Sequence, residues 1–183
     1  MKNIIILGAA RAGKTTLTSM LHKEYNYSII SIDSFVSALR DGFPSLGITH
    51  SNTENKFKLL PPFIFSYMNK IINEYPEEKF VLEGWHVFPK DIIGLFRNMD
   101  VKIICLGYTK ITCDEALYEI RKNETKNSYT TKMTDNKVKD LILNHINYSK
   151  TLREQCEENN IKYYDTSFDR EKILTEAMNY LLE

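Results

Sequence analysis

Residues 1–16 read MKNIIILGAARAGKTT, and this stretch decides the fold. The apolar run at residues 4–7 predicts a buried strand, and it leads directly into the pattern G-x-x-x-x-G-K-T between Gly8 and Thr15. Glycines at both ends of such a loop let successive backbone N–H groups point inward, and the start of the following helix adds its positive end. The stretch therefore predicts a site for the polyphosphate of a nucleoside triphosphate.

Two side chains of this phosphate loop are expected to contact the nucleotide most directly. Lys14 would reach the β- and γ-phosphates, and the Thr15 hydroxyl would bind Mg²⁺. The predicted nucleotide-binding residues of the loop are Gly8, Ala9, Ala10, Arg11, Ala12, Gly13, Lys14, Thr15 and Thr16.

Length and composition are those of one soluble domain that spans residues 1–183. The 24 Lys and Arg residues balance 24 Asp and Glu residues, and a formal net charge of zero disfavours a nucleic-acid partner. Cysteines at positions 105, 113 and 156 are odd in number and widely spaced, which fits a reducing cytoplasm. No apolar run reaches about 18 residues, so we expect neither a membrane span nor a signal peptide.

Strand-like and helix-like patterns alternate along the whole chain. The predicted strands after the first cover residues 27–32, 79–84, 101–106 and 161–164, and the predicted helices cover 15–25, 35–40, 57–75, 90–97, 112–121, 135–158 and a last segment capped by Ser167. Within 57–75, the pair Pro61-Pro62 places the second proline near a helix start. Near-continuous apolar strands separated by helices predict a three-layer α/β fold, in which helices cover both faces of a parallel sheet.

In such sheets, ligands bind beyond the carboxyl ends of the strands. The predicted strands end at Asp33, Glu83, residues 107–109 and Asp165. All of these positions are therefore expected on the same edge of the sheet as the phosphate loop.

Asp33 and Glu83 are the predicted catalytic carboxylates. Phosphoryl transfer needs an in-line nucleophile, and Asp33 can orient or deprotonate a substrate hydroxyl. Its alternative role is to cap the following helix, and the two roles are compatible. Glu83 follows an apolar strand as a Walker B acid does, which predicts a role in binding Mg²⁺ or as the base. Its alternative is a strand-end carboxylate paired with a surface cation.

The residues around the third strand end suggest an acceptor pocket. Trp85 and His86 follow Glu83 directly and can line such a pocket. Arg40 and Lys56 border the break after the second strand and can recognise an anionic acceptor, although a solvent-facing role is equally open.

Apolar periodicity is lost at residues 122–134, which read KNETKNSYTTKMT. A mobile segment rich in cations can fold over a nucleotide, exclude water and stabilise transition-state charge. Arg121 stands at its hinge and has the fork that suits phosphate, so it is a predicted catalytic residue together with Lys14. The alternative is a solvated charge run at a helix end.

With these residues, the chain resembles the small P-loop kinases of the nucleoside-monophosphate-kinase-like group. The resemblance implies a five-stranded parallel sheet of order 2-3-1-4-5 and places a short lid at residues 122–134. It also implies ATP as the donor, because Asp165-Thr166-Ser167 matches the polar turn that touches adenine, which adds Asp165 and Thr166 to the nucleotide-binding residues. The family's lid usually carries several arginines, whereas here Arg121 is followed by lysines.

Two shorter stretches are similar to kinases of the 2-phosphoglycerate kinase type. They are Asp33-Ser34 followed by Leu39-Arg40, and residues 83–89, which read EGWHVFP. This similarity suggests a small hydroxyl-bearing acceptor.

The leading hypothesis is therefore an ATP- and Mg²⁺-dependent phosphotransferase that acts on a small molecule, as a cytoplasmic monomer or homodimer without a nucleic-acid or membrane partner. The alternative from another class is a nucleotide-dependent regulatory or switch protein that hydrolyses ATP slowly. A third option, a kinase acting on an RNA end, is disfavoured by the neutral net charge.

Overall fold

The computed structural model describes residues 2–51, 53–124, 128 and 130–183, so positions 125–127 and 129 of the predicted lid lie outside the described residues. The described elements are β1 (Asn3–Gly8), α1 (Lys14–Tyr25), β2 (Ser28–Ser31), α2 (Ile32–Gly42), the short 3-10 helix η1 (Pro44–Leu46), α3 (Glu54–Glu74), β3 (Phe80–Gly84), α4 (Pro89–Phe96), β4 (Val101–Gly107), α5 (Cys113–Lys122), α6 (Asp135–Glu158), β5 (Lys162–Asp165) and α7 (Arg170–Leu182).

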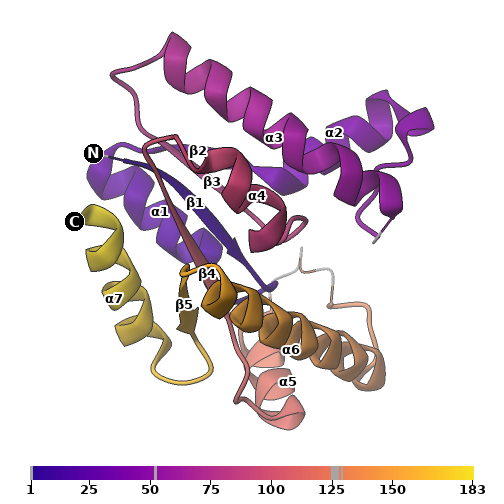
Figure 1. Cartoon of the computed structure of the whole chain (residues 1–183). Coiled ribbons are helices and arrows are strands. Elements are labelled where there is room, and N and C mark those ends of the chain that lie inside the picture. The colour runs from indigo at the N-terminus through magenta and orange to yellow at the C-terminus, as the bar shows by residue number, and fades with distance from the viewer. Residues whose placement is uncertain (1, 52, 125–127, 129) are drawn as a thin grey trace.

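One parallel sheet joins the five strands in the order β2-β3-β1-β4-β5. The strand that carries the phosphate loop, β1, lies at its centre between β3 and β4 (Figure 1). Ser31 of β2 pairs with Glu83 of β3, and Gly107 of β4 pairs with Asp165 of β5. The predicted fold class and the strand order implied by the resemblance are confirmed, and the predicted strand ends share one edge of the sheet.

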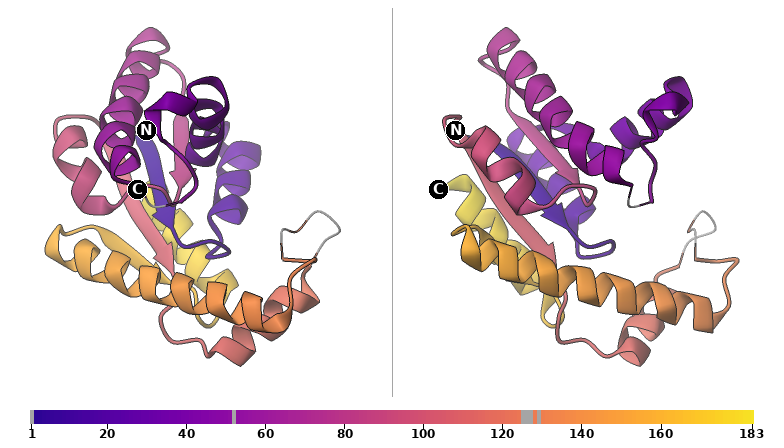
Figure 2. Two further views of the ribbon diagram at one scale, coloured as in Figure 1. Left: turned by 90° about the vertical axis from the view of Figure 1, so that its right-hand side faces the viewer. Right: turned by 45° about the vertical axis from the view of Figure 1, so that its right-hand side comes forward.

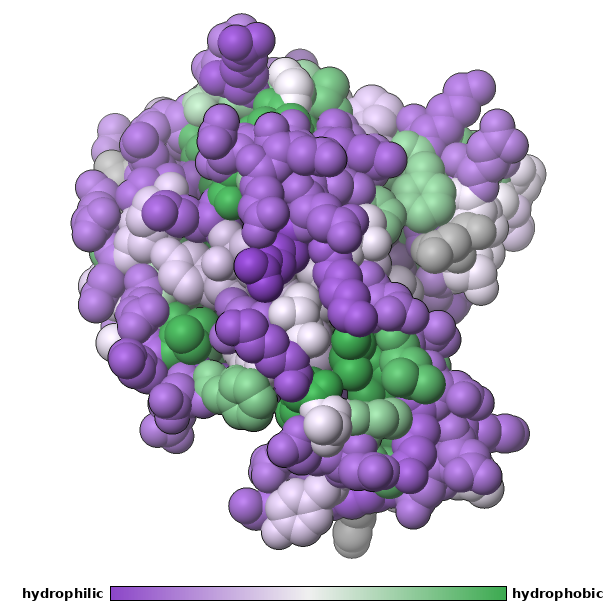
Figure 3. Space-filling view, turned by 60° about the horizontal axis from the view of Figure 1, so that its bottom comes forward, coloured by the Kyte–Doolittle hydropathy of each residue, from purple (hydrophilic) through white to green (hydrophobic). Residues whose placement is uncertain are grey.

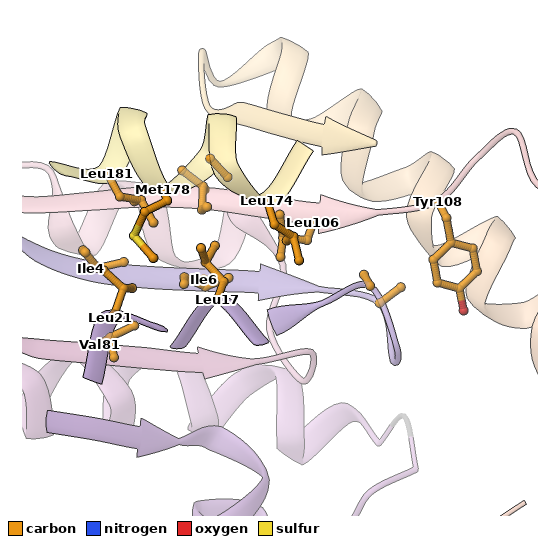
Figure 4. Close-up of a cluster of buried hydrophobic side chains, with 14 of the residues drawn as sticks. Ile4, Ile6, Leu17, Leu21, Val81, Leu106, Tyr108, Leu174, Met178 and Leu181 are labelled. Atoms are coloured by element: carbon orange, nitrogen blue, oxygen red, sulfur yellow. The ribbon is translucent and has the colours of Figure 1, made fainter. Parts of the chain in front are cut away.

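The sheet separates two hydrophobic cores, because successive side chains of a strand point to opposite faces. Ile4 and Ile6 of β1 pack with α1 and α7 on one face (Figure 4). Ile5 and Leu7 pack on the other face with α2, α3 and α4. All four side chains are fully buried, so the strand before the phosphate loop is fixed from both sides.

Helix α5 and the first turns of α6 project beyond the carboxyl edge of the sheet (Figure 2). The capping box predicted for α5 is confirmed: Thr112 accepts a hydrogen bond from the N–H of Glu115, whose carboxylate in turn accepts from the N–H of Thr112.

The face seen in Figure 3 is largely hydrophilic, with hydrophobic side chains gathered at the waist between the larger and smaller parts of the molecule. Among the described residues, no helix combines the length and apolar character needed to cross a membrane.

Helix α3 corrects the prediction that the second proline stands near a helix start. The helix begins at Glu54, and both Pro61 and Pro62 lie inside it. Thr53 caps it by accepting a hydrogen bond from the N–H of Lys56 at 3.3 Å. The prolines remove two helical N–H donors. The first turns persist nonetheless, because Lys56, Leu60 and Pro61 are buried against the body of the protein.

Two predicted helix caps are also wrong. Ser31, not Asp33, caps α2, and its hydroxyl accepts from the N–H of Ser34 at 3.4 Å. Asp33 lies in the first turn, which leaves its carboxylate for other partners. Ser167 does not cap α7 either, because that helix begins at Arg170 and the hydroxyl of Ser167 accepts instead from the N–H of Lys110 at 2.9 Å.

Candidate active site

The phosphate loop makes a tight turn between β1 and α1. Arg11 and Gly13 have left-handed backbone conformations, with φ of 64° and 101°. The N–H of Ala9 donates to the carbonyl oxygen of Leu106 at 3.1 Å, which ties the loop to β4. A Cβ atom at Gly13 would lie 3.1 Å from the Leu174 side chain and would also be strained by the positive φ, so this turn requires glycine.

Lys14 is buried under this loop. Its Nζ donates to the carbonyl oxygens of Gly8 at 3.0 Å and Ala9 at 2.9 Å. Burial lowers the pKa of Lys14, and the negative charges of Glu83 and Asp33 oppose that shift. A cation held inside a glycine-rich turn at a helix start is the arrangement that an anionic phosphate complements. The residues therefore fit a nucleotide phosphate, and Thr15 is exposed on the first turn of the helix beside it.

Asp33 and Glu83 lie on the same edge, and both are electrostatically coupled to Lys14. Burial raises the pKa of Asp33, but hydrogen bonds from His86 and Trp85 and the charge of Lys14 outweigh it, so that the pKa is lowered. Burial raises the pKa of Glu83, and repulsion from Asp33 adds to the shift. The pKa values of the two carboxyl groups are therefore shifted in opposite directions. Such a difference is what lets paired acids take different roles in a reaction.

Trp85 and His86 hold the carboxylate of Asp33. The Trp85 Nε1–H donates to Asp33 Oδ1 at 3.1 Å, and His86 Nε2 lies 3.0 Å from the same oxygen. The two rings lie against each other with centroids 4.3 Å apart. The structure thus brings together three residues predicted to act at the acceptor side, and Asp33 Oδ1 is held by two neighbours.

Lys56 is the cation that the fold brings to this cluster. Its side chain is fully buried, and its Nζ donates to the carbonyl oxygen of His50 at 3.4 Å. The ammonium also lies 5.4 Å from the ring centroid of Trp85 and is coupled to the charge of Asp33. Arg40, the other predicted acceptor cation, is exposed and forms two hydrogen bonds with the carboxylate of Asp41 at 2.7 and 3.0 Å.

We expect Lys56 to make stability depend on pH above neutrality. Burial lowers its pKa from 10.5 to about 8, against the opposing charge of Asp33. Below pH 8 the ammonium is charged in both folded and unfolded chains, and the folded state carries the whole cost of burying it. Between pH 8 and 10.5 the folded chain loses this proton first, so the cost disappears as pH rises.

The measurement compares the wild type with Lys56→Met. Across this window the free energy of unfolding of the wild type should rise relative to the variant by about 1–2 kcal/mol, which allows for solvent screening of the charge. Urea unfolding of both proteins at about pH 7 and about pH 10.5 measures the difference. An identical difference at the two pH values would contradict this origin of the pH dependence.

Arg121, the predicted catalytic residue at the hinge, makes its contacts within its own segment and with the start of α6. Its guanidinium donates to the carboxylates of Glu124 at 3.1 Å and Asp135 at 2.8 Å, and to the carbonyl oxygens of Thr130 at 3.1 Å and Met133 at 2.7 Å. These partners all belong to the 122–134 segment or to the first residue of α6. The N–H groups of the Arg121 guanidinium therefore join the two ends of that segment.

Arg11 links the phosphate loop to the same segment. Its Nη2 donates to the hydroxyl of Thr130 at 3.1 Å. The buried hydroxyl of Tyr108 donates to the carbonyl oxygen of Ala10 at 3.1 Å, on the β4 side of the loop. Arg11 and Tyr108 belong to the lining of a cavity of about 630 Å³ between α5 and the start of α7, which Thr166 and Arg170 also line. Its size and position suit a nucleoside.

Asp165 and Thr166, the residues implied to touch adenine, differ in their surroundings. Thr166 lines the cavity, whereas the carboxylate of Asp165 accepts hydrogen bonds from the backbone N–H and hydroxyl of both Thr109 and Ser167. Asp165 thus joins the loops after β4 and β5.

Two histidines near the site had no distinguishing pattern in the sequence. His50 comes from the loop before α3, and its Nδ1 lies 4.0 Å from Asp33 Oδ1. His145 lies on α6, where burial lowers its pKa to about 4 and the positive charges of Lys14 and Arg11 add to the shift. Both histidines lie near the site because the fold brings distant parts of the chain together. The sequence around each histidine gives no sign of this.

The fold is similar to that of several solved structures. A gluconokinase from Sinorhizobium meliloti 1021 matches 99% of this chain and 91% of its own length at 14% identity, with a TM-score of 0.64. A sugar kinase from Janibacter sp. HTCC2649 matches 99% and 94% at 12% identity, with a TM-score of 0.60. A shikimate kinase from Bacteroides thetaiotaomicron matches 100% and 99% at 14% identity, with a TM-score of 0.57.

No protein-family model matches the sequence, and no curated protein matches it at a significant level. The likeness therefore lies in the fold. The chain has the fold of the small P-loop kinases, and the solved structures named above are kinases of small molecules.

Proposed function

We propose that this chain is an ATP- and Mg²⁺-dependent phosphotransferase that moves the γ-phosphoryl group to a hydroxyl or phosphate group of a small-molecule acceptor. One observation carries the proposal: the buried ammonium of Lys14 shares one edge of the sheet with both Asp33 and Glu83 and is coupled to their charges. A site that only holds a nucleotide has no need of a carboxylate fixed by two neighbours beyond the phosphate loop. The kinase structures that share the fold support the same reading.

The donor side is assigned to the phosphate loop. The backbone N–H groups of residues 8–16 would surround the phosphates. The ammonium of Lys14 would move from the carbonyl oxygens of the loop to the β- and γ-phosphates. The nucleoside would occupy the cavity lined by Thr166. Thr15 and Glu83 would hold Mg²⁺, which when bound neutralises charge that develops on the phosphate oxygens. Arg11 lies within the loop itself, and Arg121 would assist Lys14 from the hinge of the lid.

The acceptor side is assigned to Asp33, with Trp85 and His86 as its supports. Their contacts fix Asp33 Oδ1, and the lowered pKa keeps the carboxylate ionised at neutral pH. An ionised carboxylate can accept a hydrogen bond from the acceptor group, align it with the γ-phosphorus and take its proton late in the transfer. The whole of residues 1–183 would act as one cytoplasmic domain, monomeric or dimeric, with residues 122–134 as its lid.

The test is a screen for acceptors by ADP formation. Nucleosides, nucleotides, sugars, hydroxy acids and aminoglycosides are supplied in turn with ATP and Mg²⁺, and Lys14→Ala protein purified in the same way controls for contaminating kinases. At least one class should raise ADP formation above the rate with water alone. If none does, while ATP is still hydrolysed slowly, the proposal fails and the regulatory alternative takes its place.

A further inference from the structure

We propose that Asp33, His50 and His86 form a binding site for one transition-metal ion, of the Zn²⁺ or Co²⁺ type. One oxygen of Asp33 and one ring nitrogen of each histidine lie within 4.8 Å of one another. The three residues come from different parts of the chain: the first turn of α2, the loop before α3 and the turn after β3. The metal site does not depend on the proposed function.

The separations are close to those of a metal-binding triad. His86 Nε2 lies 3.0 Å and His50 Nδ1 lies 4.0 Å from Asp33 Oδ1. Ligand atoms around a tetrahedral zinc ion are about 3.3 Å apart, as bond lengths of about 2.0–2.1 Å require. The side chain of His50 is 41% exposed, so it has room to move as an ion draws the three ligand atoms to that spacing.

The fold orients His50 by an outer hydrogen bond and His86 by burial. His50 Nε2 lies 3.1 Å from the hydroxyl of Ser37, so its Nδ1 is the nitrogen left for the cluster. Outer hydrogen bonds of this kind fix the ring and the tautomer of metal-binding histidines. The side chain of His86 is fully buried, yet within the described chain its Nδ1 has no hydrogen-bond partner.

Burial fixes the position of the His86 ring, which also packs against the rings of Trp85 and His50. This packing leaves Nε2 aimed at the cluster, 3.0 Å from Asp33 Oδ1. A coordinate bond at the same nitrogen would be stronger than that hydrogen bond. The position of Nε2, directed at an ionised carboxylate, is the one that a metal ligand needs.

The donor set selects the class of ion. Two imidazoles and one carboxylate suit Zn²⁺, Co²⁺ or Ni²⁺, whereas Mg²⁺ and Ca²⁺ prefer oxygen ligands. The nearby ammonium of Lys56, which bonds the carbonyl oxygen of His50, opposes any cation, so only ions that form strong bonds to nitrogen should overcome it. Three protein ligands leave a fourth position open to water or another ligand.

A consequence follows if the phosphotransferase proposal also holds. Asp33 cannot bind a metal ion and align an acceptor hydroxyl with the same oxygen atoms. The ion should therefore compete with the acceptor and leave ATP binding unchanged.

The site is tested by titrating the untagged full-length protein with Co²⁺ alone and recording the visible absorption of the bound ion. We expect one equivalent to bind. His50→Asn should weaken binding by about 100-fold or more, and Ser37→Ala, which removes only the outer hydrogen bond, by about 10-fold. His22→Gln is the matched control, because His22 Nδ1 bonds the carbonyl oxygen of Tyr27 outside the cluster, and its titration should match the wild type.

Absence of a Co²⁺ spectrum in the wild type, or an unchanged affinity in His50→Asn, would overturn the proposal. Circular dichroism shows whether each variant is folded. If His50→Asn does not fold, the Co²⁺ affinity of Ser37→Ala decides whether the site exists. Since the readout is binding and not turnover, an inactive protein that binds Co²⁺ would refute the phosphotransferase alone. An active protein that does not bind Co²⁺ would refute the metal site alone.

Discussion

Replacing Lys14 by alanine should lower the rate of phosphoryl transfer by about 10³-fold or more, which is at the upper end of what one positioned charge contributes. The reason lies in the position of the ammonium. It sits inside the phosphate loop, buried and held by two backbone carbonyls, so no other side chain of the loop can replace its charge. Steady-state rates of ADP formation with the identified acceptor measure the effect.

Lys23→Ala is the matched control for this prediction. Lys23 lies in the last turn of the same helix, α1, and is exposed. Lys23→Ala removes the same charge from the same helix without changing the loop. The rate of ADP formation by this variant should therefore equal that of the wild type. Thermal unfolding of both variants checks that the helix is intact. A Lys14→Ala protein that keeps more than about a tenth of the wild-type rate would remove Lys14 from the proposed mechanism.

The second large effect is expected for Asp33→Asn, which keeps the shape of the side chain and removes its charge. The turnover rate should fall by about 10²–10⁴-fold, as is typical for the loss of a positioned acid or base. The KM for ATP should change little, because Asp33 belongs to the acceptor side. An asparagine oxygen can still accept from Trp85 and His86, so the fold around it is expected to survive.

Asp41→Asn controls for the loss of a negative charge from α2. Asp41 lies in the last turn of that helix and pairs with Arg40 in solvent. We expect wild-type rates from this variant. Unchanged turnover of Asp33→Asn with the true acceptor would show that another group aligns the acceptor, and Glu83, with its raised pKa, would be the next residue to replace.

The sequence was sufficient to predict the sheet because each strand and helix has its own pattern in a short stretch of residues. Apolar strands such as residues 4–7, each followed by a helix pattern, can be buried on both sides only in a parallel sheet. That topology then places Asp33, Glu83 and Asp165 at one edge. The edge at which the strands end was therefore predictable from short stretches of chain, although β2 ends at Ser31 and not at Asp33.

The partners of those residues were not predictable, because they come from distant segments. Asp33 and His86 are 53 positions apart, and only the folded chain shows that Ser31 caps α2 and leaves the carboxylate of Asp33 to meet that ring. Arg121 shows the opposite case. Its charge suggested phosphate, and in the folded chain the guanidinium contacts a carboxylate of its own segment and that of Asp135 in α6.

The contact between Trp85 and Asp33 also gives the protein an internal optical probe. Trp85 is the only tryptophan in the chain, so all indole fluorescence arises beside the carboxylate that the proposed mechanism assigns to the acceptor. The ring lies against His86 and close to the ammonium of Lys56, both of which affect its emission when their charge or position changes. Emission from the unlabelled protein can therefore report events at this pocket separately from those in the nucleoside cavity.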